Sequence, residues 1–168
     1  MIGPFFVDTD VLVRSLDARE PDKQARVRGW LEYLWLERLG RTSTQVLGEY
    51  YGILTRKLRP SLPLEQARAA VGNLFAWNPR AIDRELIERA WTVETHYRLS
   101  PPDSLIVAAA QLETCPVLLS EGLQHGCVYG TVTVLNPVTT EVTEVRDTGP
   151  PAAAPYRRRG RGRPRKSG

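Results

Sequence analysis

Short apolar runs separated by long amphipathic segments constrain the fold of this chain more than any other feature. The runs Phe5-Phe6-Val7, Val117-Leu118-Leu119 and Val132 to Leu135 contain few polar side chains and are rich in branched or aromatic ones. Runs of this kind are typical of strands that are buried on both faces of a sheet. Strands that alternate with helices form βαβ units around a parallel sheet. The sequence therefore predicts a three-layer α/β domain, with a central, mainly parallel sheet flanked by helices.

The segments between these runs have helical periodicity. Apolar residues recur at three- and four-residue steps between positions 22 and 39, which places them on one face of a helix. The same criterion predicts helices over 45–57, 64–75 and 84–97. Residues 104–113 are apolar nearly all round, which predicts a buried helix. Further short strands are predicted at 41–43 and within 77–82.

The charge of the chain is concentrated at its C-terminal end. Seven cations and no acids follow residue 156, so the rest of the chain has 23 less 7, or 16, cations against 19 acids. From about residue 145 the sequence is rich in Pro, Ala, Gly and Arg and has little to bury, which is typical of disorder. The sequence thus predicts a mildly acidic folded domain over 1–140 and a disordered basic tail over 141–168.

The sequence also has features that bear on location. No apolar run reaches the roughly 20 residues of a membrane helix. The N-terminal segment has no basic region before its apolar residues, unlike a secretory signal peptide. We therefore expect a cytoplasmic protein without a membrane partner. Cys115 and Cys127 are not in a CxxC pattern and are expected to be buried thiols without zinc.

Three acids stand in apolar surroundings near the predicted strand ends. Asp8 follows the first strand, Glu49 lies on the helix after the second strand, and Asp103 opens the buried helix before the third. Ligands of parallel sheets bind beyond the carboxyl ends of the strands, so these acids are expected at one edge. Taken singly, Asp8 fits a turn cap, Asp103 a helix N-cap and Glu49 a solvated side chain. Together, without a matching cation, they favour a hard divalent ion such as Mg²⁺ or Mn²⁺.

Four segments in register resemble the motifs of a known family. Their order and spacing over about residues 3 to 138 resemble those of PIN domains, and in particular the VapC-type toxins of bacterial toxin–antitoxin pairs. The segments are Phe6-Val7-Asp8-Thr9-Asp10-Val11-Leu12-Val13, Ser43-Thr44-Gln45-Val46-Leu47-Gly48-Glu49-Tyr50-Tyr51, Leu99-Ser100-Pro101-Pro102-Asp103-Ser104-Leu105-Ile106-Val107-Ala108-Ala109-Ala110 and Leu118-Leu119-Ser120-Glu121-Gly122-Leu123-Gln124-His125-Gly126.

The resemblance implies an activity and a site. Asp8, Glu49 and Asp103 would bind one or two Mg²⁺ or Mn²⁺ ions and act as the catalytic residues of an endoribonuclease. The metal would activate a water molecule for in-line attack on an RNA phosphodiester. The resemblance also implies a small cytoplasmic toxin, often dimeric, that a cognate antitoxin protein silences.

Two positions depart from the family pattern. The family commonly has Asn at the position of Asp10, and relatives have a metal-binding Asp at the position of Gly122. Glycine has no side chain that could bind metal, so Glu121 is a further candidate metal ligand, or a water molecule takes that place. The alternative function is a catalytically weak or inactive PIN module that binds an antitoxin, and DNA or RNA through its basic tail.

The basic tail has a motif of its own. Arg161-Gly162-Arg163-Pro164 resembles an AT-hook, a short segment that lies in the narrow minor groove of A·T-rich DNA. The candidate nucleic-acid-binding residues are Arg161, Arg163, Arg165 and Lys166. The alternative is a generic basic tail that binds any polyanion, including RNA.

Aromatic residues crowd two of the predicted helices. One helix carries Trp30, Tyr33 and Trp35, and another carries Tyr50-Tyr51. We do not expect a single small core to bury all of these aromatic side chains. Because aromatic side chains are enriched at protein interfaces, we expect a homodimer.

Overall fold

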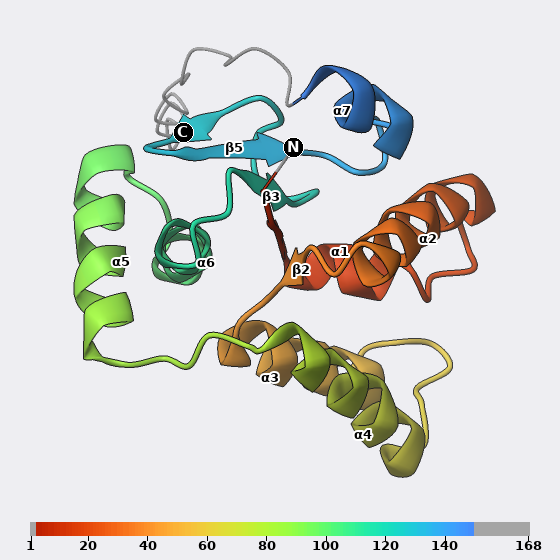
Figure 1. Cartoon of the computed structure of the whole chain (residues 1–168). Coiled ribbons are helices and arrows are strands. Elements are labelled where there is room, and N and C mark those ends of the chain that lie inside the picture. Colours follow the sequence, from red (N-terminus) through yellow and green to blue (C-terminus); the bar gives the residue numbers. More distant parts are fainter. Residues whose placement is uncertain (1–2, 150–168) are drawn as a thin grey trace, which may run out of the picture.

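The computed structural model describes residues 3–149, which form a five-stranded sheet flanked by helices (Figure 1). The strand order is β2-β1-β3-β5-β4, and all neighbouring pairs are parallel except β4 and β5. The prediction of an α/β fold with a mainly parallel sheet is confirmed. The strands are β1 (Phe5–Val7), β2 (Gly40–Arg41), β3 (Val117–Leu119), β4 (Val128–Tyr129) and β5 (Val132–Leu135).

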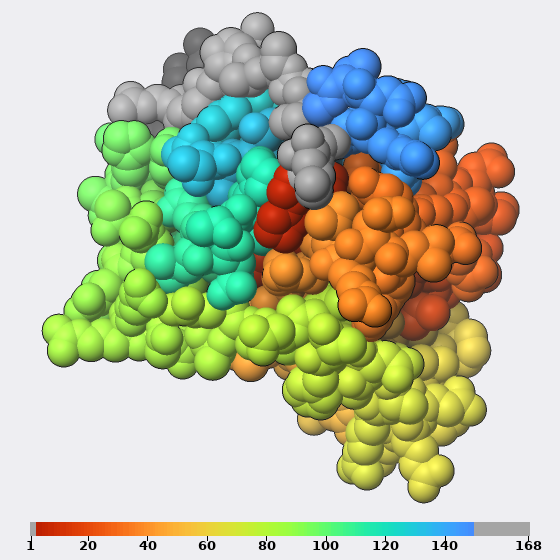
Figure 2. Space-filling view, viewed as in Figure 1, coloured from red at the N-terminus to blue at the C-terminus, as the bar shows by residue number. Residues whose placement is uncertain are grey.

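The helices cover the sheet on both sides. In Figure 1, α5 and α6 lie on one side of β1 and β3, and α1 and α2 lie on the other. Helices α3 and α4 pack against each other, and α4 belongs to a lobe at the lower right of Figure 2. The helices are α1 (Thr9–Arg14), α2 (Pro21–Leu36), α3 (Thr44–Arg56), α4 (Leu64–Asn73), the 3-10 helix η1 (Leu74–Trp77), α5 (Arg84–Tyr97), α6 (Pro101–Leu112) and α7 (Val142–Thr148).

The core is built on the central strands. Every residue of β1 and β3 is fully buried, because helices cover both faces and strands flank both edges. Trp30 of α2 packs its ring against Phe5, with ring centroids 5.7 Å apart, and its Nε1 donates a hydrogen bond to the carbonyl of Thr140 at 2.8 Å. Burial of such side chains contributes about 1.5–3 kcal/mol each, so these short strands are stabilised mainly by packing.

Strand register aligns the carboxyl ends of the three central strands. Val7 is paired with Leu119, and Leu119 with Leu135. The backbone N–H of Asp8 continues the ladder by donating to the carbonyl of Leu119 at 3.0 Å. The residues that follow β1, β3 and β5 therefore emerge at one edge of the sheet, where ligands of parallel sheets bind.

Helix α6 begins earlier than the sequence predicts. Pro101 and Pro102 occupy its first turn, where the missing N–H of proline has no intrahelical partner in any case. The hydroxyl of Ser100 caps the helix by accepting a hydrogen bond from the backbone N–H of Asp103 at 3.3 Å. Asp103 therefore lies within the first turn of the helix, and the N-cap role considered for it belongs to Ser100.

Three other segments differ from their predictions. Residues 77–82 form no strand, only an isolated bridge between Ser43 and Arg80, and the two-residue strand β4 was not predicted. The predicted tail over 141–168 begins with helix α7, whose Val145 is buried, and its remainder from residue 150 lies outside the described residues. Within residues 3–149, no helix has the length and apolar character needed to cross a membrane.

Candidate active site

Asp8 lies directly after β1, at the centre of the sheet edge. Its Oδ1 accepts a hydrogen bond from the backbone N–H of Thr9 at 2.7 Å, and its Oδ2 accepts one from the hydroxyl of Ser120 at 2.9 Å. The first contact makes Asp8 the N-cap of α1, so the cap role considered from the sequence is present. The second ties the end of β1 to the end of β3.

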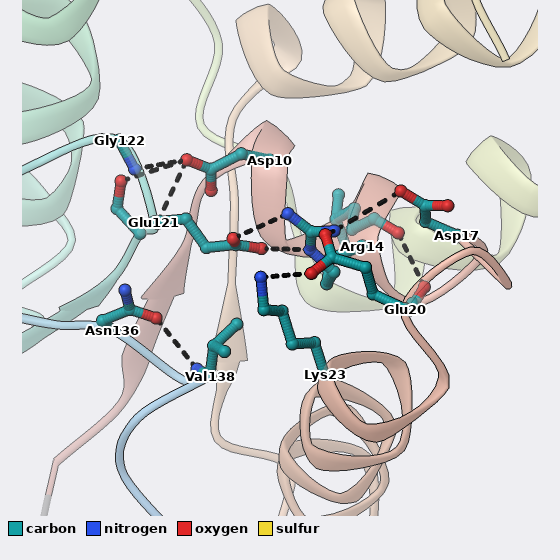
Figure 3. Close-up of polar contacts among 12 residues, drawn as sticks. Asp10, Arg14, Asp17, Glu20, Lys23, Glu121, Gly122, Asn136 and Val138 are labelled. Carbon is teal, nitrogen blue, oxygen red and sulfur yellow. Dashed lines mark hydrogen bonds and ion pairs between the residues drawn. The ribbon is translucent and has the colours of Figure 1, made fainter.

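Asp10 lies in the first turn of α1 and faces the loop after β3 (Figure 3). Its Oδ2 accepts hydrogen bonds from the backbone N–H groups of Gly122 at 2.7 Å and Glu121 at 3.1 Å. The buried hydroxyl of Ser120 also lies 3.4 Å from this oxygen. Ser120 therefore stands between the carboxylates of Asp8 and Asp10. This contact between position 10 and the 120–122 loop was not predicted from the sequence.

The two carboxylates are electrostatically unfavourable in their charged forms. Burial, followed by the negative charge of Asp10, raises the pKa of Asp8 to about 7; Ser120 and Thr9 oppose this rise through hydrogen bonds, and Asp103 adds to it. Burial also raises the pKa of Asp10, against the lowering effect of the two loop N–H groups. Among the ion pairs of residues 3–149, none joins a cation to either side chain.

Glu49 approaches the same edge from α3, although its side chain is exposed. Its Oε2 accepts a hydrogen bond from the hydroxyl of Thr9 at 2.8 Å, and its Oε1 accepts one from Nε2 of Gln45 at 3.0 Å. The same Nε2 donates to the carbonyl of Pro102 at 3.2 Å, next to Asp103. Glu49 is thus held near Asp8 through Thr9, and Gln45 connects α3 to the start of α6.

Glu121 faces away from this group of acids. Its two carboxylate oxygens accept hydrogen bonds from Nε and Nη2 of Arg14, at 2.8 and 3.0 Å. Nη1 of Arg14 also contacts Glu20 at 2.9 Å and Asp17 at 3.4 Å, as Figure 3 shows. These partners raise the pKa of Arg14 and keep it charged. The predicted metal role of Glu121 would require it to leave a bidentate ion pair.

The backbone conformation at position 122 does not require a glycine. The φ angle of Gly122 is not positive, so other residues could adopt its backbone angles. However, a Cβ atom at this position would lie 3.2 Å from Oδ2 of Asp10, closer than an ordinary van der Waals contact. The space beside Gly122 is therefore occupied by the carboxylate of Asp10.

The predicted metal ligands form an incomplete arrangement. Within residues 3–149, no group of three or more His, Cys, Asp or Glu side chains is spaced to hold a metal ion. The chemistry of the site nevertheless fits a hard divalent cation, because its donors are carboxylate and hydroxyl oxygens, and no cation of the described residues forms an ion pair with Asp8 or Asp10. Oδ1 of Asp10 is buried and has no well-aligned hydrogen-bond partner within residues 3–149, while the Val11 backbone N–H is close enough to the carboxylate to lower the Asp10 pKa. The tail residues Arg161, Arg163, Arg165 and Lys166 lie outside the described residues.

Comparison with known proteins identifies the family. Residues 5–125 match the PIN domain family. The chain belongs to the PIN domain family. PIN domains are generally nucleases that use divalent metal ions. The match covers all four segments whose resemblance was noted in the sequence, except for Gly126 at the end of the last one.

Solved PIN structures of toxin–antitoxin systems share the fold. A toxin–antitoxin complex from Klebsiella pneumoniae superposes with a TM-score of 0.57 and 20% identity, over 83% of this chain and 100% of the other. VapC20 of Mycobacterium tuberculosis, a Sarcin-Ricin loop cleaving toxin, has a TM-score of 0.51 and 22% identity, over 68% and 86%. FitAB bound to an IR36 DNA fragment has a TM-score of 0.62 and 20% identity, over 82% and 97%. No curated protein sequence matches this PIN domain.

Proposed function

We propose that this PIN domain is a metal-dependent endoribonuclease of the VapC toxin type. The observation that carries the proposal is the half-buried carboxylate of Asp8, which lies beside Asp10 at the sheet edge and forms no ion pair with a cation of residues 3–149. Isolated charges of this kind are costly unless a counter-ion is bound. A hard divalent ion supplies the positive counter-charge. Metal-dependent hydrolysis of phosphodiesters also requires such an ion.

Asp8, Glu49 and Asp103 would hold Mg²⁺ or Mn²⁺ and form the catalytic set. When bound, the ion lowers the pKa of a water molecule and stabilises negative charge on the phosphate. The protein groups around these acids have an orienting role. Ser120 fixes one oxygen of Asp8, and Thr9 fixes one oxygen of Glu49. Such supporting contacts commonly change metal affinity by about 10- to 100-fold when they are removed.

The partners that we propose are an RNA substrate, a cognate antitoxin and a second copy of the chain. One of the similar structures is a toxin–antitoxin complex, and FitAB is bound to a DNA fragment. The basic tail residues Arg161, Arg163, Arg165 and Lys166 are proposed to bind DNA or RNA. Of the aromatic residues considered for an interface, Trp30 and Tyr50 are buried, whereas Trp35 is 40% exposed and available for a homodimer. We propose a cytoplasmic location, in keeping with these partners.

An assay of RNA cleavage tests the proposal. A panel of structured RNAs is incubated with the wild-type protein in the presence of Mg²⁺, Mn²⁺ or EDTA. We expect cleavage that requires the metal and that Asp8→Asn and Asp103→Asn abolish. Asp147→Asn, on the exposed surface of α7, is the matched control and is expected to cleave like the wild type. Cleavage that is equal in EDTA, or equal in Asp8→Asn, would refute the proposal.

A second function, a PIN module that binds without cleaving, is favoured by one observation. Position 122 carries no carboxylate, and the neighbouring Glu121 is engaged by Arg14. Under this alternative, the RNA panel stays intact in metal while the protein still binds an antitoxin or nucleic acid. Fluorescence anisotropy with the same RNAs measures that binding independently of cleavage.

A further inference from the structure

Glu49 is exposed to solvent, and yet both of its carboxylate oxygens are held. Oε2 accepts a hydrogen bond from the hydroxyl of Thr9 at 2.8 Å, and Oε1 accepts one from Nε2 of Gln45 at 3.0 Å. A glutamate on the surface of a helix ordinarily samples several rotamers, and fixing one of them costs conformational entropy. The two contacts therefore give this exposed carboxylate a defined position.

Gln45 contacts two helices with one amide group. It lies in the first turn of α3, one helical turn before Glu49, so the two side chains share a face. Its Nε2 also donates to the carbonyl of Pro102 at 3.2 Å. Pro102 belongs to the first turn of α6 and immediately precedes Asp103. The amide of Gln45 thus links the carboxylate of one proposed site residue to the backbone beside another.

The other end of the same amide has no partner. Oε1 of Gln45 is buried and accepts no hydrogen bond from residues 3–149. Turning the amide by half a turn would bring Oε1 against the Glu49 carboxylate and the Pro102 carbonyl, which are both acceptors. The amide therefore has one favoured orientation. Buried acceptors without a donor are rare and unfavourable, and functional sites are among the places where proteins retain them.

These contacts extend a hydrogen-bonded chain along the sheet edge. Ser120 donates to one oxygen of Asp8, and the N–H of Thr9 donates to the other. The hydroxyl of Thr9 donates to Glu49, and Gln45 continues the chain to α6. The chain joins the ends of β1 and β3 to helices α1, α3 and α6. Gln45 is the member that connects the start of α6 to the rest.

An uncharged donor suits this place. A lysine or arginine could also hold Glu49, but its positive charge would pair with the carboxylate and oppose a bound cation. An acidic side chain would repel Glu49. An amide donates a hydrogen bond and leaves the negative charge in place. Among the ion pairs of residues 3–149, none joins a cation to Glu49 or Asp103.

We propose that Gln45 is a positioning residue of this site, which fixes the Glu49 carboxylate and the start of α6 relative to each other without neutralising either acid. The inference rests on the proposed function, because Glu49 and Asp103 are metal-binding residues only there. Gln45 acts through these two neighbours and contacts neither the metal nor the RNA. Sites of this kind need their groups held to within about 0.5 Å.

Replacement of the amide by an apolar side chain of similar length tests the proposal. Gln45→Met keeps a good helix former at this position and removes the donor. The Kd for Mn²⁺ is measured by calorimetry and by electron paramagnetic resonance of free Mn²⁺, neither of which needs catalysis. We expect Mn²⁺ binding to weaken by about 10- to 100-fold. The kcat of RNA cleavage should fall, while KM for the RNA stays within about threefold of the wild type.

Gln24 provides the matched control. It is partly buried like Gln45, and its Nε2 donates to the carbonyl of Ser15 at 3.2 Å, a contact between α2 and the end of α1. Gln24→Met is expected to bind Mn²⁺ and cleave RNA like the wild type. Urea denaturation measures the stability of both variants. If Mn²⁺ affinity fell in proportion to stability in both of them, Gln45 would have a structural role alone.

Gln45→Lys separates position from charge. A lysine can still donate to Glu49, so this variant is expected to be as stable as the wild type in urea. Its positive charge should nevertheless weaken Mn²⁺ binding by about tenfold or more. A Gln45→Lys protein that binds Mn²⁺ like the wild type would refute the need for an uncharged donor. This variant also decides the matter if Gln45→Met does not fold.

The outcomes distinguish this inference from the proposed function. If the wild type binds Mn²⁺ and cleaves RNA, and Gln45→Met does both equally well, the positioning role is refuted while the metal-dependent function stands. If the wild type binds Mn²⁺ without cleaving, the comparison of Kd values decides alone. If the wild type binds no Mn²⁺ at millimolar concentration and leaves the RNA intact, the proposed function fails, and this inference fails with it.

Discussion

The guanidinium group of Arg14 binds both carboxylate oxygens of Glu121, with Nε–Oε1 and Nη2–Oε2 distances of 2.8 and 3.0 Å. Both side chains are 19% exposed, so the pair is shielded more than a surface ion pair. Planar, bidentate pairs of arginine and carboxylate are among the stronger ionic contacts in proteins. This pair holds the loop after β3 against α1, and with it the N–H groups that contact Asp10.

The Arg14–Glu121 pair is expected to stabilise the folded protein. Glu121→Gln should lower the free energy of unfolding by about 1–3 kcal/mol, because it leaves a half-buried guanidinium without its strongest partner. Urea denaturation at pH 7 measures the change. A double-mutant cycle with Arg14→Gln isolates the pair from the contacts that Arg14 makes with Glu20 and Asp17. Purely additive losses in that cycle would show that the pair itself contributes nothing.

The raised pKa of Asp8 has a consequence for stability against pH in metal-free protein. A carboxyl group whose pKa is higher in the folded state binds its proton more tightly there. Its contribution to stability is therefore complete below the unfolded pKa of 3.8 and is lost as pH rises toward about 7. The loss is on the order of 4 kcal/mol, at 1.36 kcal/mol for each pH unit. Asp8→Asn should remove it.

The difference between wild type and Asp8→Asn isolates this effect from other groups. Asp17, whose pKa is lowered to about 2 by its contacts with Arg19, changes stability in the opposite direction, but equally in both proteins. In EDTA between pH 4 and 8, the free energy of unfolding of Asp8→Asn should increase relative to that of the wild type as pH rises. Parallel curves for the two proteins would contradict the raised pKa.

Divalent metal is expected to stabilise the wild type, and more at high pH. Binding to the folded state alone adds about 2.7 kcal/mol at a metal concentration of 100 times Kd. For a protein of this size, that corresponds to a rise in Tm of roughly 5–10 °C. Because protons compete with metal for the carboxylates, the rise should be larger at pH 8 than at pH 5.5. Differential scanning fluorimetry with Mg²⁺ and Mn²⁺ measures it; an equal rise in Asp8→Asn would place the ion elsewhere.

Trp30 is expected to be the most sensitive single position of the α2 core. It is 1% exposed, packs against Phe5 and donates to the carbonyl of Thr140. Trp30→Ala should cost about 3–5 kcal/mol of unfolding free energy through the cavity that it leaves. Trp30→Phe keeps most of the packing but leaves the Thr140 carbonyl without its donor, at about 1–3 kcal/mol. Chemical denaturation of both variants separates packing from hydrogen bonding, and a Trp30→Phe protein as stable as the wild type would show that the hydrogen bond adds nothing.

The sequence predicted the parts of the fold whose local signal is strong. Strands β1, β3 and β5 and helix α5 have the predicted bounds, because continuous apolar runs and a capped amphipathic helix are distinctive. The strand β4 has only two residues, Val128 and Tyr129, and it exists through its antiparallel pairing with β5. No local pattern in two residues could distinguish it from a loop. The predicted start of helix α6 was later than the observed one. Prolines break the interior of a helix, although proline is tolerated in its first turn.

The candidate site was predicted in part for similar reasons. Asp8 was expected at the sheet edge because acids after buried strands emerge there, and Glu49 because its helix follows the next strand. The relation between Asp10 and Gly122 joins residues 112 positions apart, and each taken alone looks like a defect. Only the register between β1 and β3 brings the two together.

The same register determines when this site can exist during synthesis. The Asp8 carboxylate is completed by Ser120, which lies 112 residues later in the chain. Contacts of such long sequence separation form slowly and require most of the intervening chain to fold. A nascent polypeptide that stops before residue 120 lacks Ser120 and the loop after β3. The hydrogen bonds that this loop makes with Asp8 and Asp10 therefore cannot form. An unfinished chain therefore cannot assemble this edge of the sheet, and the contact between Asp8 and Ser120 forms only after nearly the whole domain has left the ribosome.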